Sequence, residues 1–357
     1  MKFNRKSLVS AYDTIKVLLP AEVTTLRLTE EYIESVSEAL AVKVRIGNDQ
    51  LVPEKIDVLL EKNKLGSIIH SASGDNIEIT ADGTETYFKA GKAKYQLSVV
   101  NTSLPEVNYS KQEYTILEKG SVIADLLETT SYAMADASTS RHILNGVCLT
   151  GEEGKLKAAG CDSYRLAVAE RESSNRFSFT HVIGENMVKA ILCICKKNPD
   201  ETMTLEMGET SFAFSSSNVK IQSAYLAGSY PQTSRLIPES FNTSFTISRE
   251  ELEGIMRRIS MFKIDRMTIC AMNIEEGGKV SFETKDETGN AYEETEGELE
   301  GEPMKLAFNT EYLLDVLKVL HGEKVTIHFA GEMKPFILNS EDNTSDIHLM
   351  LPVRTFN

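Results

Sequence analysis

The sequence lacks any long apolar run. No stretch approaches the roughly 20 consecutive apolar residues that a membrane-spanning helix needs. The N-terminus has basic residues followed by apolar ones, as a signal peptide does, but Ser10, Tyr12, Asp13 and Lys16 interrupt the apolar part. We therefore expect a cytoplasmic protein without a membrane partner.

Catalytic and metal-binding motifs are also missing. The chain contains no HExxH, GxGxxG, P-loop or GxSxG pattern, and its six histidines form no local cluster. Its five cysteines are scattered and odd in number, which favours free thiols in a reducing compartment. We expect no metal, no cofactor and no enzymatic activity. A hydrolase or transferase that uses Asp162 and His142 is the alternative, although no convincing base and nucleophile accompany them.

The composition is that of an ordinary globular protein, with an uneven charge. The 357 residues are 41% hydrophobic and 25% charged, and their length predicts two or three domains. The net charge is −15, and the segment from Glu275 to Glu302 alone contributes −9, with eleven acidic residues and two lysines. Net acidity disfavours nucleic-acid binding. Because the acid is localised, an acidic outer face can coexist with a basic inner one.

Strand and helix patterns recur along the chain in the same order. An apolar stripe at Leu8, Tyr12 and Ile15 predicts a helix after a short strand, and Ser248 with Glu251 forms a capping box before another helix. Three rounds of this kind, each with two helices, divide the chain into six similar half-units. We therefore predict three α+β domains with boundaries at 1–110, 111–240 and 241–357.

The second helices of the three rounds support this repeat. LVPEKIDVLLEK, HVIGENMVKAILCICKK and LAFNTEYLLDVLKVL start at Leu51, His181 and Leu306, and they share an apolar lead-in, a polar pair and an amphipathic stretch. In the first of them we expect a helix from Pro53. Lysines and arginines on the exposed faces of such helices are weak evidence for a shared basic surface, because surface helices commonly carry lysine in any case.

The stretch Gly160–Ala169, GCDSYRLAVA, places a cation beside an apolar strand. A short polar turn precedes Arg165 and Leu166, which is a plausible edge for a binding groove. The alternative is a surface turn whose arginine pairs with a nearby carboxylate.

Several segments together resemble a known family. They are RHILNGVCL (Arg141–Leu149), CDSYRLAVA (Cys161–Ala169), YPQTSRLIP (Tyr230–Pro238), LAFNTEYLLDVLKVL (Leu306–Leu320) and LMLPVR (Leu349–Arg354). As an ordered set they resemble the bacterial DNA polymerase III β subunit, the ring-shaped sliding clamp. The resemblance implies an α+β fold of three similar clamp domains, each with two helices packed on antiparallel sheets, and a closed ring formed by a head-to-tail homodimer.

The resemblance also implies a function and partners. The ring would encircle double-stranded DNA without sequence specificity, and it would tether the replicative DNA polymerase, the clamp loader and other proteins with a clamp-binding motif. A repeat scaffold that binds partner peptides without encircling DNA is the alternative.

The same resemblance implies three sets of site residues. The groove for partner peptides would be lined by Leu144, Cys161, Ser163, Tyr164, Arg165, Leu166, Pro231, Arg235, Leu236, Met333, Pro335, Leu349, Met350, Leu351, Pro352, Val353 and Arg354. DNA would be faced by Arg5, Lys16, Lys55, Arg141, His142, Lys189, Lys196, Lys197 and Arg257. The dimer interface would pair Tyr95 and Leu97 with Met261 and Phe262, and Lys92 and Lys94 would face the acidic segment from Tyr292 to Glu302.

Two residues depart from the family pattern inside the groove. The usual Thr-Asp-Gly-His-Arg-Leu is Cys-Asp-Ser-Tyr-Arg-Leu here, so Ser163 replaces a glycine and Tyr164 a histidine. We expect these replacements to change the peptide preference of the groove and not its location.

Overall fold

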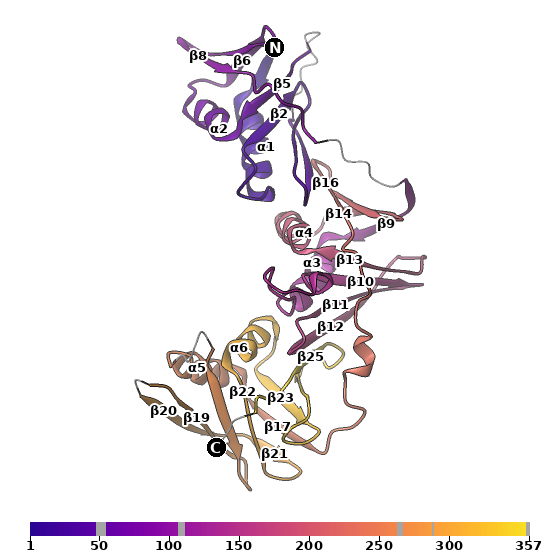
Figure 1. Ribbon diagram of the computed structural model, residues 1–357, viewed down its shortest axis with the longest axis vertical. Coiled ribbons are helices and arrows are strands. Elements are labelled where there is room, and N and C mark those ends of the chain that lie inside the picture. The colour runs from indigo at the N-terminus through magenta and orange to yellow at the C-terminus, as the bar shows by residue number, and fades with distance from the viewer. Residues whose placement is uncertain (48–54, 106–110, 263–266, 288, 355–357) are drawn as a thin grey trace. The chain divides into compact units, whose positions relative to one another are not determined.

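A computed structural model describes residues 1–47, 55–105, 111–262, 267–287 and 289–354 (Figure 1). By their internal contacts, these residues form two compact units. The first contains Met1–Ala124 and Ile183–Tyr225, and the second contains Asp125–Val182 and Leu226–Asn357. In the described ranges, no helix is long and apolar enough to cross a membrane.

The repeating element is a strand that runs directly into a helix, and the described residues contain it six times. The pairs are β1 (Lys2–Asn4) with α1 (Arg5–Leu18), β5 (Asp57–Glu61) with α2 (Lys62–Ser71), β9 (Gln112–Lys119) with α3 (Gly120–Ser131), β13 (Phe179–Gly184) with α4 (Glu185–Lys197), β17 (Thr243–Ser248) with α5 (Arg249–Ile259), and β22 (Met304–Asn309) with α6 (Thr310–Val319). The predicted pairing of helices in three rounds matches this order.

Short polar side chains at the ends of the strands start several of these helices. Asn4 accepts a hydrogen bond from the Ser7 amide at 3.1 Å, and Asn309 accepts one from the Glu311 amide at 2.9 Å. Ser248 accepts one from the Glu251 amide at 3.4 Å, as the predicted capping box requires. Each cap satisfies a backbone amide that has no partner inside its helix.

The first unit contains two antiparallel sheets. The four-stranded sheet has the order β1, β6 (Asn76–Ala81), β7 (Glu85–Ala90), β8 (Ala93–Ser98). The eight-stranded sheet has the order β5, β2 (Thr25–Thr29), β3 (Tyr32–Val36), β4 (Ala41–Arg45), β16 (Val219–Ala224), β15 (Ser211–Ser215), β14 (Thr202–Gly208), β9. Because β4 pairs with β16, this sheet continues across the boundary predicted near residue 110.

The second unit also contains two sheets. The nine-stranded sheet has the order β13, β10 (Gly146–Glu152), β11 (Lys155–Cys161), β12 (Arg165–Glu172), β25 (Ile347–Met350), β24 (Phe336–Ser340), β23 (Lys324–Phe329), β17, β21 (Glu298–Glu300). The four-stranded sheet has the order β20 (Asn290–Glu296), β19 (Lys279–Lys285), β18 (Ile269–Ile274), β22. Antiparallel pairing of β12 with β25 joins segments that lie far apart in the sequence.

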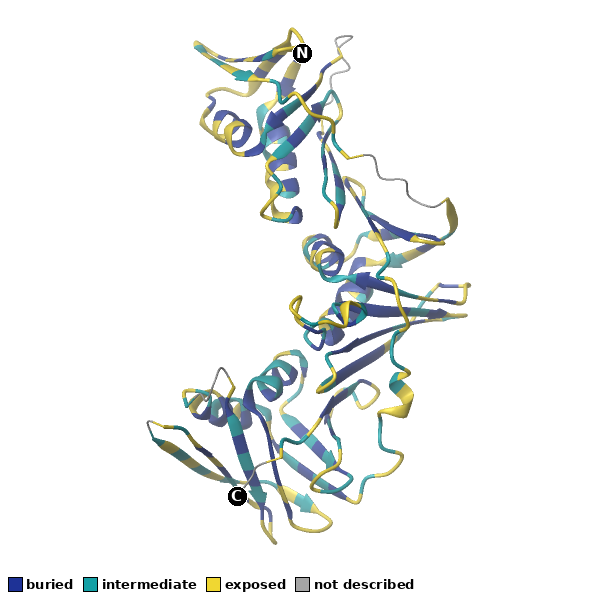
Figure 2. Cartoon of the chain, viewed as in Figure 1, coloured by how far each residue is buried: buried dark blue, intermediate teal, exposed yellow. Residues whose placement is uncertain are grey.

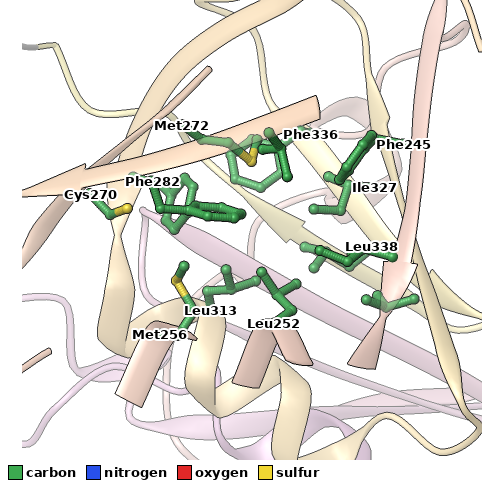
Figure 3. Packing of buried hydrophobic residues seen from close by; sticks show 14 of the residues in the cluster. Phe245, Leu252, Met256, Cys270, Met272, Phe282, Leu313, Ile327, Phe336 and Leu338 are labelled. Carbon is green, nitrogen blue, oxygen red and sulfur yellow. The ribbon is translucent and has the colours of Figure 1, made fainter. Parts of the chain in front are cut away.

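The core of the second unit packs α5 and α6 against both of its sheets. Leu252, Met256 and Leu313 from the helices contact a cluster that includes Phe282 and Phe336 from the strands, all at most 1% exposed (Figure 3). Apolar burial of this extent is the main favourable term in folding. It fixes the position of α6, which matters for the site described below.

Six strands and the start of one helix differ from the sequence-based expectation. The prediction of a helix from Pro53 is wrong, because residues 57–61 form the strand β5. In β5, Val58 and Leu60 are buried and Leu59 lies on the opposite face. The helix starts only at Lys62, and residues 52–54 lie outside the described ranges. The strands β3, β13, β20, β21 and β22 were not predicted from the sequence either.

Candidate functional site

A groove of about 360 Å³ lies in the second unit, where the end of β25 meets the turn between β11 and β12. The residues that line it are Arg141, Cys161, Ser163, Tyr164, Arg165, Leu166, Pro231, Leu236, Pro335, Leu349 and Leu351. They come from the turn, from the segment between β16 and β17, from the lead-in to β24 and from the C-terminal segment. The groove therefore assembles parts of the chain that the sequence separates widely.

The turn from Asp162 to Arg165 forms one wall. Asp162 Oδ1 accepts hydrogen bonds from the backbone amides of Tyr164 and Arg165, at 2.8 and 2.9 Å. Ser163 has a φ of 81°, a left-handed conformation that favours glycine and is strained for serine. The Leu351 amide donates to the Tyr164 carbonyl at 2.9 Å, so the turn also holds the C-terminal segment in place.

Arg165 is held by its own neighbours. Its Nε donates to Asp162 at 2.9 Å and its Nη1 donates to Asp315 on α6 at 2.7 Å, and its side chain is only 11% exposed. The guanidinium lies 4.4 Å from the ring centre of Tyr312 and 5.5 Å from that of Tyr132. Arg165 therefore pairs with nearby carboxylates, as the alternative interpretation of this stretch predicted. It also lines the groove.

Most of the predicted groove residues line this hollow, but some do not. Leu144 is 1% exposed and Met350 is fully buried. Because side chains alternate along β25, Leu349 joins the cluster with Cys161 and Leu166, whereas Met350 points into the core around α5 and α6. The predicted residues outside the lining are Leu144, Arg235, Met333, Met350, Pro352, Val353 and Arg354.

Arg141 lines the groove, although it was predicted to face DNA. It precedes the short 3₁₀ helix η1 (His142–Leu144), which carries the buried Leu144. Its place at the start of the RHILNGVCL segment was the signal that could have assigned it to the groove.

The surface of the groove is suited to apolar side chains. Tyr164, Leu236 and Leu351 are 61%, 43% and 37% exposed, large fractions for residues of this kind. Burial raises the pKa of the Cys161 thiol, which keeps it protonated and unreactive at neutral pH. The site therefore offers a shallow apolar surface, which is typical of peptide docking.

Two polar contacts hold β25 and the residue that precedes it. Arg171 binds Asp346 through two hydrogen bonds, at 2.6 and 2.8 Å, and it also pairs with Asp125 on α3. The Tyr132 hydroxyl lies 2.8 Å from Nδ1 of His348, whose pKa burial lowers to about 4. The first contact ties β12 to the residue before β25, and the second ties the turn after α3 to β25.

In the first unit, α1 and α4 border a basic hollow of about 420 Å³. Arg5, Lys6 and Lys197 line it together with Asp13. Two of the predicted DNA-facing residues, Arg5 and Lys197, are thus close together. Lys189 pairs with Glu185 and Arg257 with Glu253 on their own helices, and Lys16 and Lys196 are exposed.

Lys55 does not fit the helix on which it was expected. It lies in the coil before β5. His142 is the first residue of η1 and Arg141 precedes it, and both are exposed.

The predicted dimer residues lie on or beside strands at sheet edges. Tyr95 and Leu97 belong to β8, which has β7 as its one hydrogen-bonded neighbour among the described residues. Met261 is 72% exposed and follows α5 together with Phe262. In the second unit, β20 is an outer strand of the four-stranded sheet. Both β8 and β20 alternate exposed and partly buried side chains (Figure 2).

Comparison with known proteins agrees with the family resemblance. The chain matches the models described as DNA polymerase III beta subunit, central domain, over residues 118–232, and DNA polymerase III beta subunit, C-terminal domain, over residues 234–354. The beta sliding clamp of Bacillus subtilis strain 168 is 26% identical over 306 residues, 84% of this chain and 80% of the relative. That of Staphylococcus epidermidis strain RP62A is 26% identical over 331 residues, 90% of this chain and 86% of the relative.

Solved structures show the same fold. The DNA polymerase III subunit beta of Pseudomonas aeruginosa superposes with a TM-score of 0.92 at 19% identity, covering 99% of this chain and 100% of that one. The DNA polymerase sliding clamp of Bacillus subtilis gives a TM-score of 0.91 at 22% identity, covering 99% of each chain.

Proposed function

The chain belongs to the DNA polymerase III β subunit family, the non-catalytic sliding clamps of processive DNA replication, and we propose that two copies close into a ring around duplex DNA. The matched segments span the central and C-terminal parts of the chain. The three domains at 1–110, 111–240 and 241–357, and a location in the cytoplasm, are part of this proposal.

Ring closure would join two sheet edges, β8 of one copy and β20 of the other. Lys92 and Lys94 are exposed at the β8 edge, and Glu294 and Glu296 are exposed on β20. Opposite charges on the two edges favour the head-to-tail arrangement over head-to-head pairing, in which like charges would meet. An open strand edge also leaves backbone groups that a partner strand can satisfy.

Within the ring, DNA would be held by phosphate contacts. The hollow that Arg5, Lys6 and Lys197 line is the best-supported contact, because it gathers three cations with one carboxylate, Asp13. Phosphate contacts carry no base information, so the ring could slide along any sequence. We assign Arg141 to the groove instead.

The groove would receive short peptides of the replicative polymerase, the clamp loader and other partners. The observation that carries this proposal is the convergence of exposed apolar side chains, Tyr164, Leu236 and Leu351, around a pre-formed hollow. Arg165 is committed to Asp162 and Asp315, so Arg141 is the lining cation that remains to meet a polar peptide group.

Two measurements test the assembly and the groove. Sedimentation at micromolar concentration should give a dimer, and a stable monomer would refute the ring. A fluorescein-labelled peptide with adjacent Leu and Phe side chains should bind, and Leu351→Ala should weaken that binding while the dimer persists. Unchanged affinity in this variant would remove the groove from the proposal.

A further inference from the structure

A buried cation connects the wall of the groove to helix α6. Arg165 donates to Asp162 within the turn and to Asp315 on α6, at 2.9 and 2.7 Å. Tyr312, one turn before Asp315 on the same helix, lies under the guanidinium at 4.4 Å and beside the Tyr164 ring at 6.5 Å. One face of α6 therefore contacts both the arginine and the exposed aromatic residue of the wall.

This arrangement matters because the turn is strained on its own. Ser163 holds a left-handed φ of 81°, which an L-residue adopts at a cost. Asp162, which orders the turn through two backbone amides, is itself paired with Arg165. The strained conformation persists only where surrounding contacts hold it. The Leu351 amide, the Tyr312 ring and the Arg165–Asp315 ion pair all reach the wall from outside the turn, and the ion pair is the charged contact among them.

We propose that Asp315 is a positioning residue for the peptide groove, which holds the Asp162–Tyr164 wall in its binding conformation through Arg165. This inference rests on the proposed function of the groove in peptide binding. Asp315 is 31% exposed and its other oxygen accepts from Lys318 at 2.8 Å, so the helix presents this carboxylate to two cations, of which Arg165 is the buried one. Asp315 acts on the peptide only through Arg165 and the wall.

The proposal predicts a specific kinetic signature. Without Asp315, fewer molecules hold the wall in its binding conformation, so the apparent association rate falls in proportion to that fraction. The dissociation rate stays the same, because the contacts between the bound peptide and the groove are unchanged. A residue that touches the peptide behaves in the opposite way, with its effect mainly on dissociation.

The test is stopped-flow binding of the fluorescein-labelled peptide to the full chain. Asp315→Asn should lower the association rate about tenfold with an unchanged dissociation rate. Asp315→Ala should show the same signature, since alanine also lacks the carboxylate that accepts from Arg165. Leu351→Ala should instead raise the dissociation rate, and Lys318→Gln, which removes the exposed partner of Asp315, should change neither rate.

Two results separate failure of this inference from failure of the groove itself. If the unmodified chain does not bind the peptide, the proposed groove is wrong. If it binds and Asp315→Asn leaves the association rate unchanged, or changes only dissociation, Asp315 does not position the wall. Thermal unfolding of each variant is measured alongside, and should Asp315→Asn fail to fold, the Asp315→Ala rates decide in the same way.

Discussion

The ion pair between Arg171 and Asp346 joins β12 to the segment that leads into β25, and its removal should destabilise the second unit. Both guanidinium nitrogens Nη1 and Nη2 donate to Asp346, whose side chain is only 6% exposed. Asn343 donates a further hydrogen bond to the same carboxylate at 2.6 Å. Asp346→Asn removes the charge and turns one acceptor into a donor that faces Arg171.

The size of the effect follows from burial. Breaking a buried ion pair typically costs about 3–5 kcal/mol because one charge stays buried without its partner. Arg171 is 21% exposed and keeps Asp125, so we expect a loss near the lower limit, about 3 kcal/mol. For a unit of this size, such a loss lowers the melting temperature by about 6–12 °C.

Differential scanning calorimetry measures this change, and the chain supplies a matched control. Asp125 pairs with the same arginine but is 45% exposed, so Asp125→Asn should cost less than about 1 kcal/mol. If Asp346→Asn shifts the transition no more than Asp125→Asn does, the Arg171 contacts do not hold the two strands together.

Three further perturbations have expected outcomes. Burial lowers the pKa of His348 to about 4, so below pH 6.5 the unfolded chain binds a proton at this residue that the folded chain does not bind. The free energy of unfolding, measured by urea titration, should therefore fall by about 3 kcal/mol between pH 6.5 and 4. His348→Gln should make the free energy of unfolding depend less steeply on pH. An equal slope in the variant would assign the loss to other groups. Ser163→Gly should raise stability by about 0.5 kcal/mol, since relief of the left-handed φ outweighs the added freedom of the unfolded chain; a lower urea midpoint would contradict this. Leu97→Lys, at the β8 edge, should shift sedimentation toward monomer, whereas an unaltered dimer would place the interface elsewhere.

The helices could be predicted from the sequence wherever an apolar stripe and a cap coincided. Ser248 is an example, and it caps α5 in the structure. The strand β20, NAYEETE, was missed because Glu293 lies on its partly buried face, so the sequence lacks the apolar–polar alternation that is typical of a half-buried strand. The β5–α2 boundary was misplaced because a short apolar run reads equally well as strand or helix.

Much of the groove could be predicted from the family resemblance, but the role of Arg165 could not. Its second carboxylate partner, Asp315, lies 150 residues away in the sequence, so only the folded chain brings them together. The burial of Met350 depends in the same way on which face of β25 turns toward α5 and α6.

Retention on DNA circles tests the central claim most directly. The protein should be loaded onto a nicked circular duplex by a clamp loader and separated from free protein by gel filtration at a salt concentration that abolishes simple phosphate contacts. A ring that encircles DNA should stay with the circle and be lost when a restriction enzyme linearises it, because it slides off the ends. Loss from circles and linear DNA alike, or equal retention on both, would show that the chain does not hold DNA by encircling it.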